Sequence, residues 1–179
     1  QPNKLREALD FYYNFYQKYS NEMWAEKLGL DEFISGDDEL IRELTSLLQS
    51  VETDMTIFFR LLSSIEIPEI SHLTYAFYSP DSIPEKEWNI WLNKWWSRVK
   101  ENPSREKMKL ANPKYVLRNW MAQLAIDAAE KEDFSIAIEL YELLKKPYSE
   151  QSEYEEKWFI KRPEWARHRV GCSMLSCSS

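Results

Sequence analysis

Both cysteines of this 179-residue sequence lie in its last eight residues, at Cys172 and Cys177. The stretch before them is basic, because residues 157–170 hold one acid, Glu164, and five bases, Lys157, Lys161, Arg162, Arg167 and Arg169. Positive neighbours favour thiolate over thiol and so raise reactivity toward disulfides and oxidants. We therefore expect thiol redox chemistry here, favoured at Cys172 by proximity and less so at Cys177.

Two alternatives to this redox role follow from the same residues. Chain ends are poorly ordered unless they are tied down, so the segment could also be a frayed end with inert thiols. Cys172 and Cys177 could also pair with each other as a local redox switch.

A zinc site is the other chemistry that these residue types allow. His72, His168, Cys172 and Cys177 could supply two nitrogens and two sulfurs to a tetrahedral centre. Structural zinc sites normally show closely spaced ligand pairs, whereas His72 is distant and the other three do not have finger or ribbon spacing. We therefore expect no metal site, and a hydrogen-bonded, surface or partly buried position for each histidine.

Other catalytic patterns are missing from the sequence. The acidic segments SGDDELIRE and EYEEKW are typical of solvated helix faces, and catalytic acid pairs need two carboxyls in unlike environments. No G-x-S-x-G motif occurs. The three glycines, Gly29, Gly36 and Gly171, are scattered, whereas a phosphate-binding loop needs them clustered. We expect no catalytic and no cofactor-binding residue in this sequence.

The overall composition narrows the partners. With 44% hydrophobic and 30% charged residues the chain is typical of a soluble globular protein, and it lacks the apolar run of about 20 residues that spans a membrane. A net charge of −7 disfavours nucleic acid. Two cysteines make no disulfide framework, which fits a cytosol-like compartment. The sequence opens in a helical pattern without Met or signal peptide, so we expect a piece of a longer chain.

Apolar residues recur at three- and four-residue steps almost everywhere, which predicts an all-α fold of about seven helices. On the first helix the residues expected to face inward are Leu5, Leu9, Tyr12, Tyr16, Tyr19 and Met23. Gly29 is expected to end that helix in the left-handed conformation. The remaining helices are expected near 37–51, 54–65, 84–102, 112–133, 133–147 and 152–159. In the fifth, Asn112 is read as the cap, and Val116, Leu117 and Trp120 as inward-facing.

Tryptophan is unusually abundant, with eight in the chain. WNIWLNKWW cannot place every ring on one helix face, because neighbouring positions such as Trp95 and Trp96 point about 100° apart. Two packing layers inside one domain explain this pattern, and the alternative is that one ring faces a partner protein.

One helical hairpin offers a different functional class. Residues 113–147 approach the spacing of a tetratricopeptide hairpin, which would make the chain an adaptor that binds peptides. A solenoid needs about three repeats, and the sequence has no second copy. The adaptor is therefore the alternative interpretation.

Several segments resemble the C-terminal region of the selenoprotein O family. In the family's order, and over nearly the whole chain, they are MWAEKLGL, TDMTIFFRLL, NPKYVLRNWMAQLAIDAAEKEDF, LLKKPYSE, KRPEWA and the terminal SCSS. The resemblance implies a pseudokinase parent that binds ATP in a flipped orientation with a divalent metal such as Mg²⁺. Such a parent transfers AMP to protein hydroxyls, as a protein adenylyltransferase.

The same resemblance gives Cys177 a role. The third residue from the C-terminus is selenocysteine in many eukaryotic members and cysteine in bacterial ones, and Cys177 matches that position. In the family this residue can pair with a cysteine in the activation segment of the kinase-like core, which implies redox control of activity. The segment ARHRVGCSMLS matches poorly, so Cys172 has no family counterpart, and KRPEWA has one proline where the family often has two.

The elements that would bind nucleotide in such a family are missing from the sequence. It contains no Gly-rich loop, strand lysine, catalytic loop or D-F-G, so no ATP or metal residue of the family can be assigned to a position here. We expect an all-α domain over residues 1–165 and a flexible, redox-active tail over 166–179. The domain would support the kinase-like core of its parent chain and be inactive alone. The parent would act on protein substrates, in the cytoplasm if bacterial and in mitochondria if eukaryotic.

Overall fold

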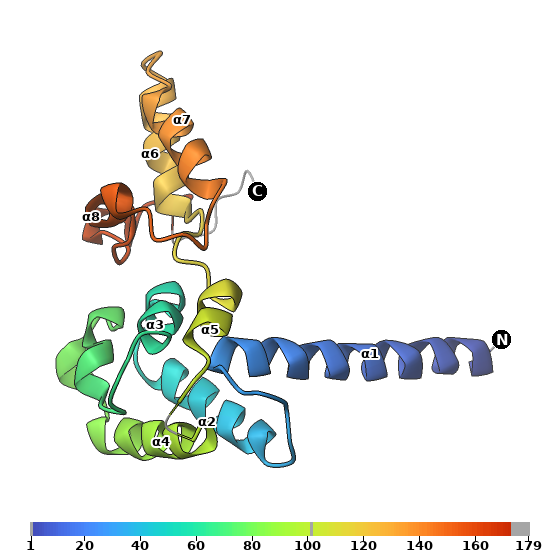
Figure 1. The fold of residues 1–179 in the computed structure, drawn as a ribbon. Helices are drawn as coiled ribbons and strands as arrows, with labels where there is room; N and C mark the ends of the chain where they lie inside the picture. Colours follow the sequence, from blue (N-terminus) through green and yellow to red (C-terminus); the bar gives the residue numbers. More distant parts are fainter. Residues whose placement is uncertain (1, 101, 173–179) are drawn as a thin grey trace.

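The computed structural model describes residues 2–100 and 102–172, and helices make up this part of the chain (Figure 1). Its α-helices are α1 (Pro2–Leu28), α2 (Asp37–Ser50), α3 (Met55–Leu62), α4 (Glu85–Arg98), α5 (Arg105–Ala111), α6 (Asn119–Ala129), α7 (Ser135–Leu144) and α8 (Glu155–Trp158). Short 3-10 helices are η1 (Ile70–Ala76), η2 (Pro80–Ser82), η3 (Ser152–Tyr154) and η4 (Glu164–Ala166). The described ranges contain isolated bridges, such as the one between Thr53 and Phe77, but no strand, so the all-α prediction is confirmed.

Tryptophans of α4 form the centre of the core. Trp88, Trp91 and Trp95 lie one helical turn apart and are at most 1% exposed. The indole N–H of Trp91 donates to the Leu40 carbonyl at 2.8 Å, and that of Trp95 to the Leu28 carbonyl at 2.9 Å. These bonds satisfy two polar groups that burial would otherwise penalise. These tryptophans therefore build the interior of this domain.

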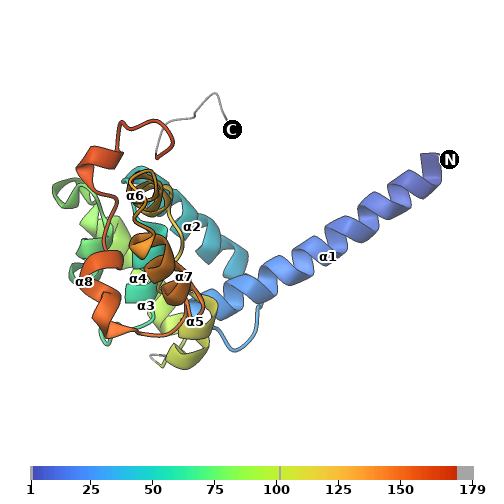
Figure 2. The ribbon, with the colours of Figure 1, turned by 90° about the horizontal axis from the view of Figure 1, so that it is seen from above.

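The long helix α1 joins the rest of the molecule only near its end. Leu28 and Leu30 are fully buried, and Gly29 takes the predicted left-handed conformation with φ of 68°. A Cβ at Gly29 would lie 2.8 Å from the sulfur of Met108 on α5, so the close approach also requires glycine. The earlier turns of α1 extend away from the other helices in both views (Figures 1 and 2).

The face of α1 that the periodicity assigns to the core is exposed. The side chains are 44–67% exposed at Leu5, Leu9, Tyr12, Tyr16, Tyr19 and Met23. The prediction that they face inward is therefore wrong within this chain. Its physical basis was correct, because the pattern does give one apolar face. No other element of the described chain lies against that face.

The start predicted for the fifth helix is also wrong. Asn112 ends α5, with extended backbone at φ −115° and ψ 98°, and α6 begins at Asn119. A residue before proline is biased away from helical angles, so Asn112 marks the end of a helix rather than its cap. The backbone N–H groups of Lys114 and Tyr115 both donate to the Pro147 carbonyl, which holds the segment non-helical. As a result Val116 and Leu117 are 40% and 52% exposed.

Candidate functional site

Cys172 is buried within the fold and does not lie on its surface. Its side chain is buried, with 7% exposed. Its backbone N–H donates to the Arg169 carbonyl at 3.1 Å, and its own carbonyl accepts from Asn119 Nδ2, at the start of α6, at 3.3 Å. Gly171, with φ of 83°, makes the turn that brings Cys172 there. The expected redox reactivity of this thiol stays a prediction, and Cys177 lies outside the described residues.

The chain that leads to Cys172, which we call the C-terminal strap (residues 160–172), is fastened by its basic side chains. Each of them binds an acidic or carbonyl group from earlier in the chain. The pairs are Lys161 with the Phe77 carbonyl, Arg162 and Arg167 with the Glu52 carboxylate, and Arg169 with Asp127. Hydrogen bonds from Gln123 and Arg169 lower the pKa of Asp127, which keeps that acid ionised. The basic stretch seen in the sequence therefore serves to attach this segment.

The C-terminal strap also contacts Tyr78 through Arg162. The Arg162 backbone N–H donates to the Tyr78 hydroxyl at 2.9 Å. Burial raises the pKa of Tyr78 despite this donated bond, so the phenol stays neutral at ordinary pH. The Arg162 guanidinium lies 5.1 Å from the centre of the Tyr78 ring, within the range of a cation–π contact.

The histidines do not form a metal centre with these groups. His72, on η1, and His168, on the strap, are both exposed. Within residues 2–100 and 102–172, no three His, Cys, Asp or Glu side chains lie close enough to hold a metal ion. The described residues therefore do not assemble the zinc site of two histidines and two cysteines that the sequence allows. Cys177, one of its four possible ligands, lies outside the described residues.

A second polar cluster, which we call the polar joint, links α3 to the segment after α7. Arg60 is 5% exposed and donates to Glu150 Oε1 at 2.6 Å, while Lys114 donates to Glu150 Oε2 at 3.0 Å and to Glu155 at 2.7 Å. Burial disfavours the charged form of Glu150, but the bonds from Lys114 and Arg60 outweigh this and lower its pKa to about 2. The joint is thus charged at any physiological pH.

Tyr115 adds hydrogen bonds to the polar joint. Its hydroxyl donates toward the carbonyls of Glu150 and Gln151, at 2.9 and 3.0 Å. Burial, reinforced by the negative charges of Glu155 and Glu150, raises the pKa of Tyr115 to about 12. Together these contacts place the loop after α7 against α3, so the joint has a structural role.

Two carboxylates, Asp37 and Asp54, are buried in ion pairs that the sequence does not predict. Asp37, in the segment expected to be a solvated face, is 3% exposed and binds Arg98 through both oxygens, at 2.7 and 2.9 Å. Asp54 is 8% exposed and binds Arg118 in the same two-pronged way. The expectation of solvation is wrong for Asp37, because its partner is 61 residues away and no local pattern announces it.

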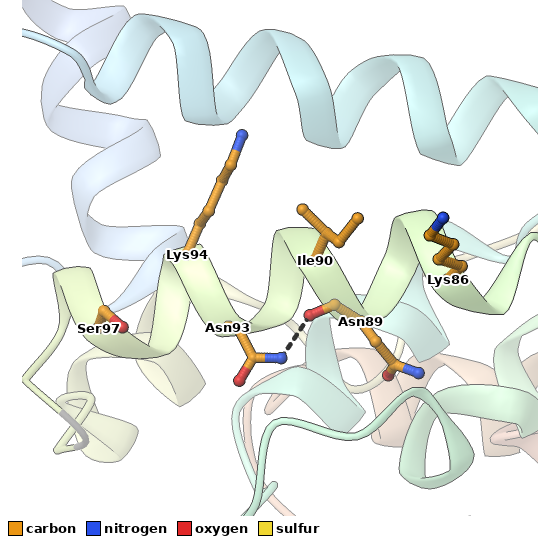
Figure 3. Close-up of a pocket in the computed structure, with 6 residues that line it drawn as sticks. All are labelled: Lys86, Asn89, Ile90, Asn93, Lys94 and Ser97. Atoms are coloured by element: carbon orange, nitrogen blue, oxygen red, sulfur yellow. Dashed lines mark hydrogen bonds between the residues drawn. The ribbon is translucent and has the colours of Figure 1, made fainter.

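A surface hollow lies along the outer side of α4 (Figure 3). Its volume is about 760 Å³, and its lining comes from one helix: Lys86, Asn89, Ile90, Asn93, Lys94 and Ser97. Several of these groups already have partners. Asn89 accepts from the Ile70 N–H, Asn93 donates to the Asn89 carbonyl, and Lys94 pairs with Glu43. Ligand pockets are concave and bring polar groups together from several elements, which this face does not do.

The architecture and its joints define an all-helical protein domain with a tryptophan-rich core. Residues 1–146 match the family model described as "Protein adenylyltransferase SelO". The chain belongs to this family of protein adenylyltransferases, which confirms the resemblance drawn from its motifs.

Relatives named "Protein nucleotidyltransferase YdiU" agree with this assignment. One from Flavobacterium johnsoniae is 51% identical over 172 residues, covering 88% of this chain and 33% of the relative. One from Rhodopirellula baltica is 43% identical and covers 98% of this chain and 37% of the relative. A third, from Aromatoleum aromaticum, is 42% identical and covers 98% and 35%. The chain therefore spans about a third of the length of these bacterial relatives.

Among the described residues, no helix is both long and apolar enough to cross a membrane.

Proposed function

We propose that this chain is the C-terminal helical domain of a SelO-type enzyme that transfers AMP from ATP to protein hydroxyls. In this role it supports the nucleotide-binding core of the parent chain and supplies Cys177 as a redox residue. The observation that carries the proposal is the family match over residues 1–146 in a chain only a third as long as its relatives. The bacterial relatives favour the bacterial branch of our expectation, a cytoplasmic parent enzyme.

Nucleotide and metal chemistry would reside in the remaining two-thirds of the parent chain. ATP and Mg²⁺ are its expected cofactors, and its substrates are expected to be other proteins. The scattered glycines and the open, single-helix hollow on α4 support the absence of a nucleotide site from this domain.

Calorimetry tests this division directly. We expect no heat of binding when ATP and Mg²⁺ are added to this chain, and clear binding when they are added to the parent chain. A micromolar Kd for this chain alone would overturn the division.

The redox role rests on the family position of Cys177 and gains support from the attachment of Cys172. Cys177 is five positions after Cys172, and extended chain spans at most about 18 Å over that distance. A cysteine that pairs with Cys177 would therefore lie near the start of α6, where Cys172 is tied down.

The test uses the parent enzyme and a matched pair of variants. Oxidation should change AMP transfer in the natural protein and in Cys172→Ser, but not in Cys177→Ser. A redox response that survives Cys177→Ser would contradict this role. The adaptor interpretation is not proposed, because the family match includes nearly all of the 113–147 hairpin on which it depends.

A further inference from the structure

Helix α1 has two sharply different sides. At about 100° per residue, the apolar side chains of residues 5–23 fall within one arc of about 200°. Its members are Leu5, Leu9, Phe11, Tyr12, Tyr13, Phe15, Tyr16, Tyr19 and Met23. The opposite arc holds Arg6, Glu7, Asp10, Asn14, Gln17, Lys18 and Asn21, and the polar residues Ser20 and Glu22 interrupt the apolar arc. A division of this kind is typical of a helix whose apolar side is buried.

This side, which we call the aromatic face of α1, is bare in the structure. Its members are between 43% exposed, at Phe15, and 67% exposed, at Leu5. Both ribbon views show these turns clear of the other helices (Figures 1 and 2). Large contiguous apolar surface of this kind marks an interaction site in a soluble protein.

The rings are already ordered against one another along the helix. The Phe11 and Phe15 rings lie 4.3 Å apart, and the Tyr12 and Tyr16 rings are stacked at 6.1 Å. Between them runs an open hollow of about 460 Å³, lined by Tyr12, Phe15, Tyr16, Tyr19, Ser20 and Met23. Tyrosine rings carry large contact area with a polar tip, and they are favoured anchors at protein interfaces.

We infer that the aromatic face of α1 docks within the parent polypeptide, against the folded nucleotide-binding portion that lies outside this structure. The inference rests on the proposed function, since it names the surface by which this domain supports that portion. About two-thirds of the length of the relatives is not in this chain, and the family match includes α1. In these relatives the segment that corresponds to this chain is accompanied by a much longer portion of the same polypeptide, which is the partner that we infer for α1.

The width of the face distinguishes this partner from a second copy of α1. In a two-stranded coiled coil, the buried seam uses only the a and d positions of each heptad, a narrow stripe. An arc of about 200° is wider than such a seam, and wider than the stripe of an ordinary surface helix. Covering it requires a concave surface made by several elements, which a folded domain supplies and a single opposing helix does not.

Cysteine labelling of the parent protein tests this contact. Tyr12→Cys places a thiol in the middle of the aromatic face, and Asn14→Cys places one on the opposite arc as the matched control; both positions are exposed in this chain. In the parent protein we expect maleimide to modify Tyr12→Cys about tenfold more slowly than Asn14→Cys, with rates read peptide by peptide, because reaction requires local opening of the contact. Tyr19→Cys repeats the measurement, so one badly folded variant does not decide it.

Each outcome decides the question. Protection that persists on dilution, with a monomer in sedimentation, supports docking within the chain. Equal rates at the two positions overturn it. Protection that disappears on dilution together with a dimer assigns the face to a second copy and also overturns it. AMP transfer by the same samples is measured in parallel, so an enzyme that is active but unprotected refutes this inference alone, while an inactive parent refutes the proposed function.

Discussion

The buried pair of Asp54 and Arg118 should be among the most sensitive points of the domain. Asp54 accepts from Arg118 at 2.5 and 2.9 Å and also caps α3, through the Ile57 N–H at 3.1 Å. The side chains are 7% and 15% exposed, so solvent screens the pair little. Removing one partner of a buried pair costs about 3–5 kcal/mol, because an uncompensated charge is left behind.

Asp54→Asn retains a capping oxygen, and Arg118 keeps its bond to the Ile160 carbonyl. We therefore expect the lower end of that range, about 3 kcal/mol of unfolding free energy. Asp54→Ala also removes the cap and should cost about 1 kcal/mol more.

Urea unfolding of Asp54→Asn, of Arg118→Met and of the double variant Asp54→Asn/Arg118→Met measures the coupling. Replacing both partners removes the stranded charge, so the double variant should cost at least about 2 kcal/mol less than the sum of the singles. Asp38→Asn is the control, because Asp38 is exposed, and it should change stability by less than about 0.5 kcal/mol. A loss below about 1 kcal/mol for Asp54→Asn, or strict additivity, would refute the reasoning.

Three further predictions concern the core, the polar joint and the strap. Trp91→Phe should cost about 1 kcal/mol more than Trp88→Phe in urea unfolding, because the Trp88 indole N–H has no bond to lose within the described structure; equal costs would contradict this. The pKa of Glu150 is lowered from 4.5 to about 2, so its contribution to stability is complete above pH 4.5 and is lost as pH falls toward 2. Glu150→Gln should therefore flatten the acid side of the stability profile, and an unchanged slope would count against the joint. Glu52→Gln releases two arginines of the strap and should speed labelling of the Cys172 thiol, as high salt should in the natural chain, whereas the exposed Glu156→Gln should not.

Local periodicity was enough to predict most of the helices. α2, α3, α4 and the α6–α7 hairpin each have an apolar stripe that meets the core, so pattern and packing agree. The pattern does not predict the short helix α5, since Asn112 and Pro113 resemble the start of a helix rather than the end of one. Pre-proline geometry and the two bonds to the Pro147 carbonyl instead end one there.

Long-range electrostatics could not be predicted in the same way. The partners of Asp37, Asp54 and Glu150 are between 36 and 90 residues away, and each acid looks locally like any solvated carboxylate. The basic stretch near the C-terminus is visible in the sequence, where it predicts an effect on the thiols. Its arginines bind Glu52 and Asp127, contacts that only the folded arrangement reveals.

For helix α1, the apolar periodicity correctly predicts an apolar helix face, but it does not predict which part of the protein covers that face. Its periodicity predicts a buried face, and the described domain leaves that face exposed while burying five tryptophans elsewhere. An apolar helix face indicates that another surface covers it, but the pattern does not indicate whether that surface belongs to the same domain. The chain spans about a third of the length of its relatives, and the uncovered face of α1 is the surface on which we propose that the rest of the parent chain packs.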